Sequence, residues 1–174
     1  DDQDQLPPAT QTGANTFGAI VDGRAFTPAD SYSTTPGNNK FKGLQVFVGN
    51  DFSNSNGDDK WTLHTGNFKI NPSIYIYIYL PTLKAKTNKY IVNESDGFEN
   101  SNLPHPHIYT HINGNNNTYL SYKSSGEIKF YRIDINNGIY AGTFVVKLKN
   151  KNNENDIIEI TNGRFDINLN TVNK

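Results

Sequence analysis

The chain has 174 residues, of which 16 are basic and 17 acidic, so its net charge is -1, and it contains no Cys. This length fits one domain, the balanced charge excludes a global field that would attract nucleic acid or anionic lipid, and the lack of Cys excludes disulfides and thiol nucleophiles. The mean hydropathy is -0.67, but an aromatic share of 12% indicates a folded protein because disordered chains are poor in aromatic residues. No apolar run approaches the roughly 18 residues of a membrane-spanning helix.

The first fifteen residues show no apolar periodicity, and Pro7-Pro8 favours an extended backbone. We therefore expect residues 1–15 to be a flexible tether and residues 16–174 to form a single β domain. The chain opens at Asp1 and contains no Met, which suggests a mature form from which a signal peptide has been removed.

From Thr16 onward the apolar residues alternate with a period of two, which is the period of a β-strand. Asp22-Gly23 separates two such runs and predicts a hairpin with a type I′ turn. Residues 28–42 contain two prolines and should be irregular. Further strands are expected at 44–48, around Trp61 and Leu63, and at 68–70, 90–92, 108–112 and 119–122.

The clearest strand is Ile74–Leu80, in which Ile and Tyr alternate strictly. The pattern places Ile74, Ile76, Ile78 and Leu80 on one face and three tyrosines on the other.

The last third of the chain predicts a four-strand meander over 127–135, 139–148, 157–161 and 164–169. Its turns are Asn136–Gly138, of the type I′ kind, and Asn162-Gly163. The apolar parity changes between Phe130 and Tyr131, which predicts a bulge or burial of both faces. The expected fold is therefore all-β with almost no helix, an antiparallel β-sandwich or barrel of about ten to thirteen strands. Its core should include Phe17, Val46, Trp61, Ile76, Ile78, Phe144, Val146, Phe165 and Ile167.

Both ends of the chain carry distinctive motifs. Leu6-Pro7-Pro8-Ala9-Thr10, Gly13 and Asn15-Thr16-Phe17-Gly18 stand at the start, and Ile-Thr-Asn-Gly-Arg-Phe-Asp-Ile occupies 160–167. This pattern resembles a family of Bacteroidota lipoproteins that is defined as a domain of unknown function. The middle of the chain matches that family only in general strand content, and Ala19 stands where members commonly have Cys.

The resemblance implies a lipid-modified cysteine just upstream of Asp1 and a place in the outer membrane, either exposed at the cell surface or facing the periplasm. The acidic cluster of Asp1, Asp2 and Asp4 is similar to the run that directs such lipoproteins to the outer face. The family implies no catalytic residues. The membrane would then be a partner only through this anchor, and we expect a monomer.

The first candidate site is the aromatic stripe of Tyr75, Tyr77 and Tyr79. Three rings on one sheet face can form a platform for a glycan or an envelope protein. Alternatively, a loop or a second sheet covers these rings and they are part of the packing.

Two other groups could bind a metal. His105, His107 and His111 share one parity, so an extended backbone would direct all three imidazoles to one side, as a zinc site requires; exposed loop histidines are the alternative. A second group supplies oxygen ligands suited to calcium, but Phe52 breaks the EF-hand pattern and turn geometry explains the same residues. This group consists of Asp51, Asn54, Asn56 and Asp58.

No Gly-x-Ser-x-Gly elbow or phosphate-binding loop is present. The sequence thus favours a noncatalytic cell-envelope lipoprotein domain that binds a glycan or protein or contributes structurally, without a cofactor and without a nucleic-acid partner. One alternative is an envelope hydrolase or metal-dependent enzyme using the His105–His111 segment. The other is a carbohydrate-binding module stabilised by a structural calcium.

Overall fold

The computed structural model describes residues 2–32, 40–49, 59–84, 86 and 88–174. Within these residues the protein is built almost entirely of antiparallel strands, which confirms the all-β prediction. The strands are β1 (Thr16–Val21), β2 (Arg24–Phe26), β3 (Ser31–Tyr32), β4 (Lys40–Phe41), β5 (Leu44–Val48), β6 (Asp59–Asn67), β7 (Ile74–Leu83), β8 (Lys89–Val92), β9 (His107–Ile112), β10 (Asn117–Asp134), β11 (Ile139–Asn150) and β12 (Asn153–Asn168). Two short 3₁₀ helices, η1 (Asp2–Gln5) and η2 (Gly114–Asn116), complete the described elements, and no described helix is long and apolar enough to pass through a bilayer.

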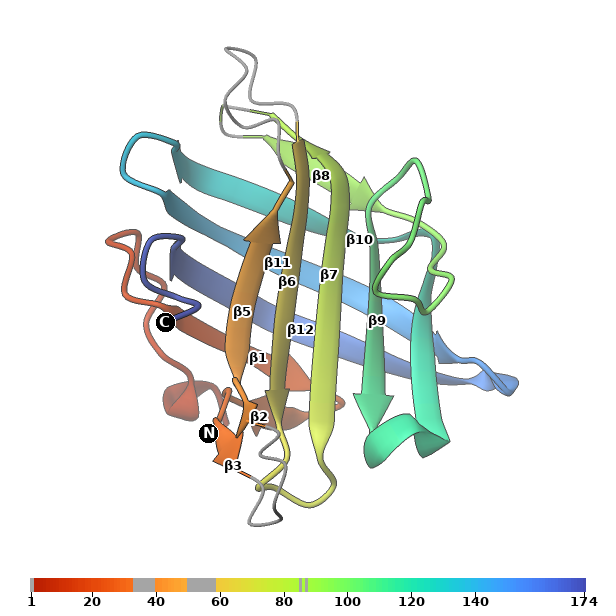
Figure 1. Cartoon of the computed structure of the whole chain (residues 1–174). Helices are drawn as coiled ribbons and strands as arrows, with labels where there is room; N and C mark the ends of the chain where they lie inside the picture. The colour runs from red at the N-terminus through yellow and green to blue at the C-terminus, as the bar shows by residue number, and fades with distance from the viewer. Residues whose placement is uncertain (1, 33–39, 50–58, 85, 87) are drawn as a thin grey trace.

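The main sheet has the order β2-β1-β12-β11-β10-β9-β7-β6-β5, and β8 also pairs with β10. The sheet curls so that β5, β6, β7 and β9 lie in front of a second layer made of β10, β11, β12 and β1 (Figure 1). The long strand β10 serves both layers because residues 117–120 pair with β9 and residues 126–129 pair with β8. The short strands β3 and β4 form a separate two-stranded sheet.

The interior between the two layers is apolar and filled by aromatic rings. Trp61 lies at its centre, with ring centroids 5.3 Å from Phe130 and 5.6 Å from Phe165. All nine residues predicted for the core are at most 4% exposed, so this prediction is confirmed. The Ile face of β7 points into this interior, as its alternation predicted.

The β1–β2 hairpin has the predicted turn, since Asp22 and Gly23 both have positive φ angles of 47° and 80°. The β10–β11 hairpin is also present, but its turn differs from the type I′ prediction. Gly138 N–H donates to the carbonyl of Ile135 at 3.3 Å, and only Gly138 in this loop has a positive φ. A one-turn loop closed by a left-handed glycine therefore joins these strands.

The Asn162-Gly163 turn prediction is wrong, because β12 continues through both residues. Asn162 has a φ of 52° and marks a bulge at which the pairing with β1 and β11 shifts. Gly163 lies opposite Phe144, and a Cβ on Gly163 would come within 2.4 Å of that ring. The glycine is therefore required by ring packing, and the last two strands of the predicted meander are one strand. The bulge predicted near Phe130 is confirmed by a register shift before Arg132.

The prediction of a flexible tether is wrong for residues 6–15, which pack onto the domain. Leu6 is buried, and the carbonyl of Pro7 accepts a hydrogen bond from Arg164 at 3.3 Å. The buried carboxylate of Asp166 accepts hydrogen bonds from Thr10 Oγ1 at 2.6 Å and from the backbone N–H of Gly13 at 2.7 Å. Composition alone suggested a tether because the group that orders this segment lies more than 150 positions away in the sequence.

Candidate functional site

The tyrosines of β7 lie on the outer face of the sheet but are not exposed. Tyr75, Tyr77 and Tyr79 are 8%, 0% and 3% exposed. They are covered by residues 93–106, the segment between β8 and β9 that we call the strap (Figure 1). The prediction of an exposed aromatic platform is therefore wrong, and these rings are part of the packing.

The tyrosine hydroxyls hold the strap in place. Tyr77 donates to the backbone carbonyl of Glu99, and Tyr79 donates to the carbonyl of Leu103 at 3.1 Å. Tyr75 donates to the side-chain Oε1 of Glu99 at 2.7 Å. A row of alternate residues on one strand thus fixes a segment that has no regular structure of its own.

The three histidines do not meet at one point. His105 Nε2 contacts the carbonyl of Glu94 at 2.7 Å, His107 Nδ1 contacts Ser95 Oγ at 2.8 Å, and His111 Nδ1 contacts Thr118 Oγ1 at 2.9 Å. Over the part of the chain that the structure describes, no three His, Cys, Asp or Glu side chains are placed to hold a metal ion. The predicted histidine site is therefore not formed there. The calcium candidates Asp51, Asn54, Asn56 and Asp58 lie outside the described residues.

The structure instead brings together Glu99, Tyr75 and His64. His64 on β6 and Tyr75 on β7 are diagonal neighbours, because His64 pairs with Tyr77. His64 Nδ1 lies 3.0 Å from the Tyr75 hydroxyl and 3.8 Å from Glu99 Oε1. Since the hydroxyl proton is directed to Glu99, the imidazole N–H is the donor to the tyrosine oxygen. The carboxylate itself is 55% exposed, so a ligand can reach it.

The two histidines near Glu99 are neutral at neutral pH. Burial lowers the pKa of His64 and of His111, and the attraction of Glu99 offsets this only in part. Burial and the hydrogen bond to Glu99 raise the pKa of Tyr75 far above its ordinary value, so its hydroxyl remains a donor. Lys60 lines one of the pockets that include Glu99, and its Nζ donates to the carbonyl of Ser101 in the strap at 3.5 Å. The Tyr75 hydroxyl thus orients the Glu99 carboxylate.

Two shallow pockets meet at Glu99. One, of about 370 Å³, is lined by Phe41, Phe68, Tyr75 and His111. The other, of about 320 Å³, is lined by Phe47, Lys60, Thr62, His64 and Asn100. Phe47, which lines one of these pockets, and Phe68, which lines the other, are 47% and 44% exposed. We call the two pockets together the Glu99 groove.

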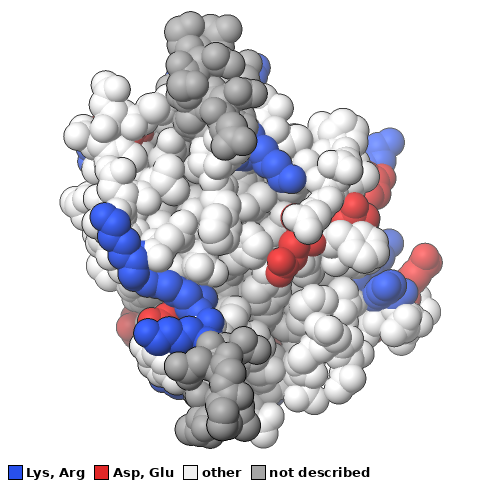
Figure 2. Space-filling view, viewed as in Figure 1, with Lys and Arg blue, Asp and Glu red and all other residues white. Residues whose placement is uncertain are grey.

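Figure 2 shows the same face with its charges. Acidic and basic atoms both lie on the right of this view, and a further group of mainly basic atoms lies at the lower left. The surface between them is largely uncharged.

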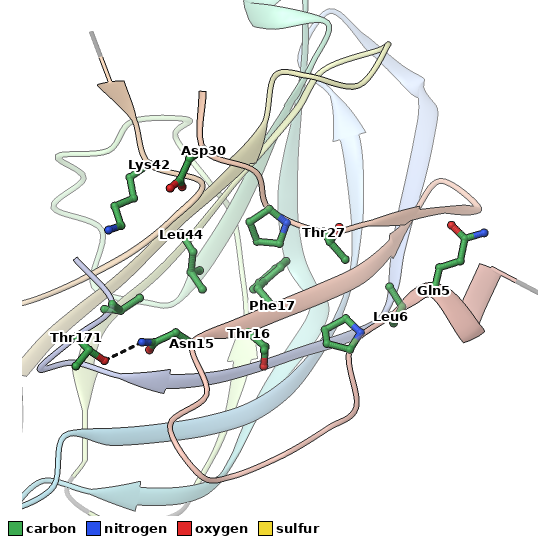
Figure 3. A pocket seen from close by; sticks show the side chains of 13 residues that line it. Gln5, Leu6, Asn15, Thr16, Phe17, Thr27, Asp30, Lys42, Leu44 and Thr171 are labelled. Atoms are coloured by element: carbon green, nitrogen blue, oxygen red, sulfur yellow. Dashed lines mark hydrogen bonds between the residues drawn. The ribbon is translucent and has the colours of Figure 1, made fainter. Parts of the chain in front are cut away.

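A larger pocket, of about 650 Å³, lies where the two edges of the curled sheet approach each other (Figure 3). Its apolar floor is formed by buried residues of the core, and its polar groups have partners within the fold. Asn15 donates to Thr171 at 2.8 Å, Asp30 accepts from the backbone of Gly43 at 2.8 Å, and Lys42 donates to the carbonyl of Lys174. This pocket is larger, but its one aromatic ring, Phe17, is buried, whereas the Glu99 groove has half-exposed aromatic rings, so the Glu99 groove is the stronger candidate site.

Sequence reasoning missed the Glu99 groove because Glu99 lies in a polar segment without periodicity. One signal was present in the sequence. Phe47 points to the outer face of its strand, opposite to Leu44 and Val46, and an aromatic residue on an outer face can belong to a binding surface. The comparison of the chain with protein-family models, curated proteins and solved structures gives no significant match.

Proposed function

We propose that this protein is a noncatalytic binding module that holds a glycan chain along the Glu99 groove. The observation that carries the proposal is a fixed, solvent-accessible carboxylate between two pockets with half-exposed phenylalanine rings. A carboxylate accepts hydrogen bonds from sugar hydroxyls, and aromatic rings pack against the apolar faces of sugar rings.

The contacts around Glu99 support binding more than catalysis. Tyr75 stays protonated, so it donates a hydrogen bond and does not act as a nucleophile or base. His64 donates a hydrogen bond to Tyr75, and Tyr75 donates one to Glu99, so both side chains serve to position the carboxylate. Glycoside hydrolysis commonly uses two carboxylates on either side of the bond, whereas among the described residues Glu99 is the one carboxylate that lines both pockets, and Tyr75 donates a hydrogen bond to it.

The shape of the groove supports a polymeric ligand. Its two pockets are open and share Glu99 in their linings. Such a surface can take consecutive units of a chain, while most of a small ligand would remain exposed to water.

We also propose that the protein is displayed at the cell envelope as an outer-membrane lipoprotein. The support is the resemblance of the terminal motifs at 6–18 and 160–167 to lipoproteins. Because residues 6–15 pack on the domain, an anchor upstream of Asp1 would hold the domain close to the membrane. Fractionation of native cells should find the protein with the membranes, and recovery only in the soluble fraction would overturn this placement.

The test of glycan binding is a glycan array followed by titration calorimetry on the best ligand. Glu99→Gln and Phe47→Ala should each weaken binding at least about tenfold, the equivalent of one lost charged hydrogen bond or packed ring. Phe98→Ala is the matched control, because Phe98 is 66% exposed and lines neither pocket. Absence of any bound glycan, or equal binding by all three variants, would refute the proposal.

A further inference from the structure

We infer that the glycan held by the Glu99 groove contains a sugar with an acetamido group, and that this group lies in the pocket beside Phe41 and Phe68. This inference rests on the proposed function and names the class of sugar that the groove selects. It follows from the rings of that pocket, from the polar groups that line it and from the contrast with the pocket beside Phe47.

The first step is a set of aromatic rings that the fold holds in place. The rings of Phe41 and Phe68 meet edge to face with centroids 4.5 Å apart, and the Phe41 ring also contacts the Tyr75 ring at 6.4 Å. The lack of a side chain at Gly66 gives the Phe41 ring its place, because an added Cβ would come within 2.9 Å of it. The His111 ring stacks on the Tyr75 ring at 5.8 Å. A methyl group that enters this pocket therefore leaves water for contact with rings that are already in position.

The second step is the polar groups that line the same pocket. Asn115 is exposed, and its side-chain amide can donate to a carbonyl oxygen, whereas the Glu99 carboxylate can accept from an N–H. An acetamido group carries both complements, a C=O and an N–H, next to its methyl group. A sugar hydroxyl can pair with the same protein groups but has no methyl group to place against the rings. The pocket as a whole therefore fits an acetamido group better than a hydroxyl.

The third step is the contrast with the pocket beside Phe47. Most side chains that line it are polar, among them Thr62 and Asn100. Among the described residues its rings are those of Phe47 and His64, which contact edge to face with centroids 5.2 Å apart. A sugar unit that carries only hydroxyl groups fits this pocket, while the acetamido group has its apolar partners in the pocket beside Phe41. This difference gives a bound chain a direction along the groove.

The test compares two neutral probes of equal length and linkage. Chitin oligosaccharides carry an acetamido group on each sugar, whereas cellulose oligosaccharides carry a hydroxyl at the same carbon. Calorimetry on the full chain should show at least about tenfold tighter binding of the chitin probe, because a methyl group is buried and an amide hydrogen bond is added. In proton NMR spectra, the ring currents of Phe41 and Phe68 should move an acetyl methyl signal of the bound probe upfield.

Three variants locate the preference within the groove. Phe68→Ala should remove most of it, whereas Phe68→Tyr keeps the ring and should retain it. Phe47→Ala changes the other pocket and should weaken the binding of both probes by the same factor. Both phenylalanines are about half exposed, so the variants should keep the wild-type Tm.

The outcomes separate the two proposals. Equal binding of both probes, or a Glu99-dependent glycan from the array that carries no acetamido group, would overturn the acetamido inference and leave glycan binding standing. If neither probe nor any arrayed glycan binds, both proposals fail. A chitin preference that persists in Phe68→Ala, or that Phe47→Ala removes, would also overturn the inference, because the acetamido group would then be recognised outside the pocket beside Phe41.

Discussion

Asp166 and Glu99 show how burial assigns different roles to two carboxylates of one chain. Asp166 is 1% exposed and accepts hydrogen bonds from two hydroxyls and three backbone N–H groups of the N-terminal segment. The Glu99 side chain is half exposed and, among the described residues, accepts one hydrogen bond, from Tyr75. The first has its acceptor capacity filled by the fold, so it is structural, while the second retains capacity for a ligand.

Replacing Asp166 should destabilise the protein. Burial alone would raise the pKa of Asp166, but hydrogen bonds from Thr10 and from the backbone around Gly13 lower it below its ordinary value. In Asp166→Asn, an amide N–H would face these donors, and we expect a loss of about 2–4 kcal/mol in the free energy of unfolding at neutral pH. Urea denaturation measures the loss. The partly buried Asp156→Asn is the comparison and should cost less than half as much.

The sign of the pH effect for Asp166 follows from its lowered pKa. The wild-type stabilisation is complete above the unfolded-state pKa of about 3.9 and is lost as the pH falls through the lower folded-state value. The Asn variant has no such group, so its disadvantage should shrink in strong acid. A constant difference between the two proteins at every pH would contradict this origin of the stability.

His107 should make the protein sensitive to mild acid. It is completely buried under the strap, its Nε2 is 3.9 Å from Asp96 Oδ1 without a hydrogen bond, and burial lowers its pKa from 6.5 to about 4. Protonation therefore favours the open or unfolded state: stability is full above pH 6.5 and falls progressively toward pH 4. The loss should reach about 3 kcal/mol, from 1.36 kcal/mol for each pKa unit.

Unfolding curves and amide exchange in the strap, recorded between these two pH values, measure the effect. His107→Gln cannot gain this charge, so its stability should be lower at neutral pH but flatter on acidification. Identical pH profiles for the two proteins would show that His107 is not the group responsible.

At the scale of elements, β7 shows how much the sequence could predict. Its alternation fixes which side faces the core, because one face of a strand must be apolar to be buried there. The cover of the tyrosine face could not be predicted, since the strap follows no period and is held by side chains from a different element. The protection of the edge strand β5 could not be predicted either. There the backbone N–H of Val46 donates to Asn173 Oδ1 at 3.0 Å, and Asn173 Nδ2 donates to the carbonyl of Val46 at 2.7 Å, so a distant side chain covers the sheet edge.

The N-terminal segment should contribute to stability, contrary to the tether expectation. Deleting residues 1–14 removes the burial of Leu6 and leaves Asp166 without its donors. We expect a loss of about 3 kcal/mol, or a fall in Tm of roughly 6–12 °C for a domain of this size. Deleting only residues 1–5 keeps both contacts and should have a much smaller effect. Equal Tm values for the longer deletion and the full chain would show that residues 6–14 do not pack.

For the whole molecule, composition and alternation were sufficient to predict an all-β protein and its core, because burial patterns are local in the sequence. The curl of the sheet, the meeting of both ends at Asp166 and the Glu99 groove depend on contacts between distant segments, which no single-sequence pattern records. Residues of the two terminal motifs, Thr10 and Gly13 at one end and Asp166 at the other, are in direct contact. These motif residues therefore have a structural role, which is to attach the N-terminal segment to the last strand of the sheet.

The filled interior leads to the last prediction, which separates core packing from ligand binding. Phe165 is 1% exposed and packs against Trp61 and Phe130 with centroids 5.6 and 5.2 Å away. Phe165→Ala should lower the free energy of unfolding by about 3–5 kcal/mol, because a large cavity would remain. Since Trp61 is the only tryptophan and is fully buried, its fluorescence reports on the core.

Trp61 emission should shift in Phe165→Ala. It should stay unchanged when a ligand binds to the native protein, because the Glu99 groove lies on the outer face of β7 and Trp61 packs on the inner, Ile-bearing face. Calorimetry at a temperature where the variant remains folded should give the wild-type affinity. Quenching of Trp61 by a bound glycan, together with loss of affinity in Phe165→Ala, would place the ligand inside the curled sheet and remove the Glu99 groove as the binding site.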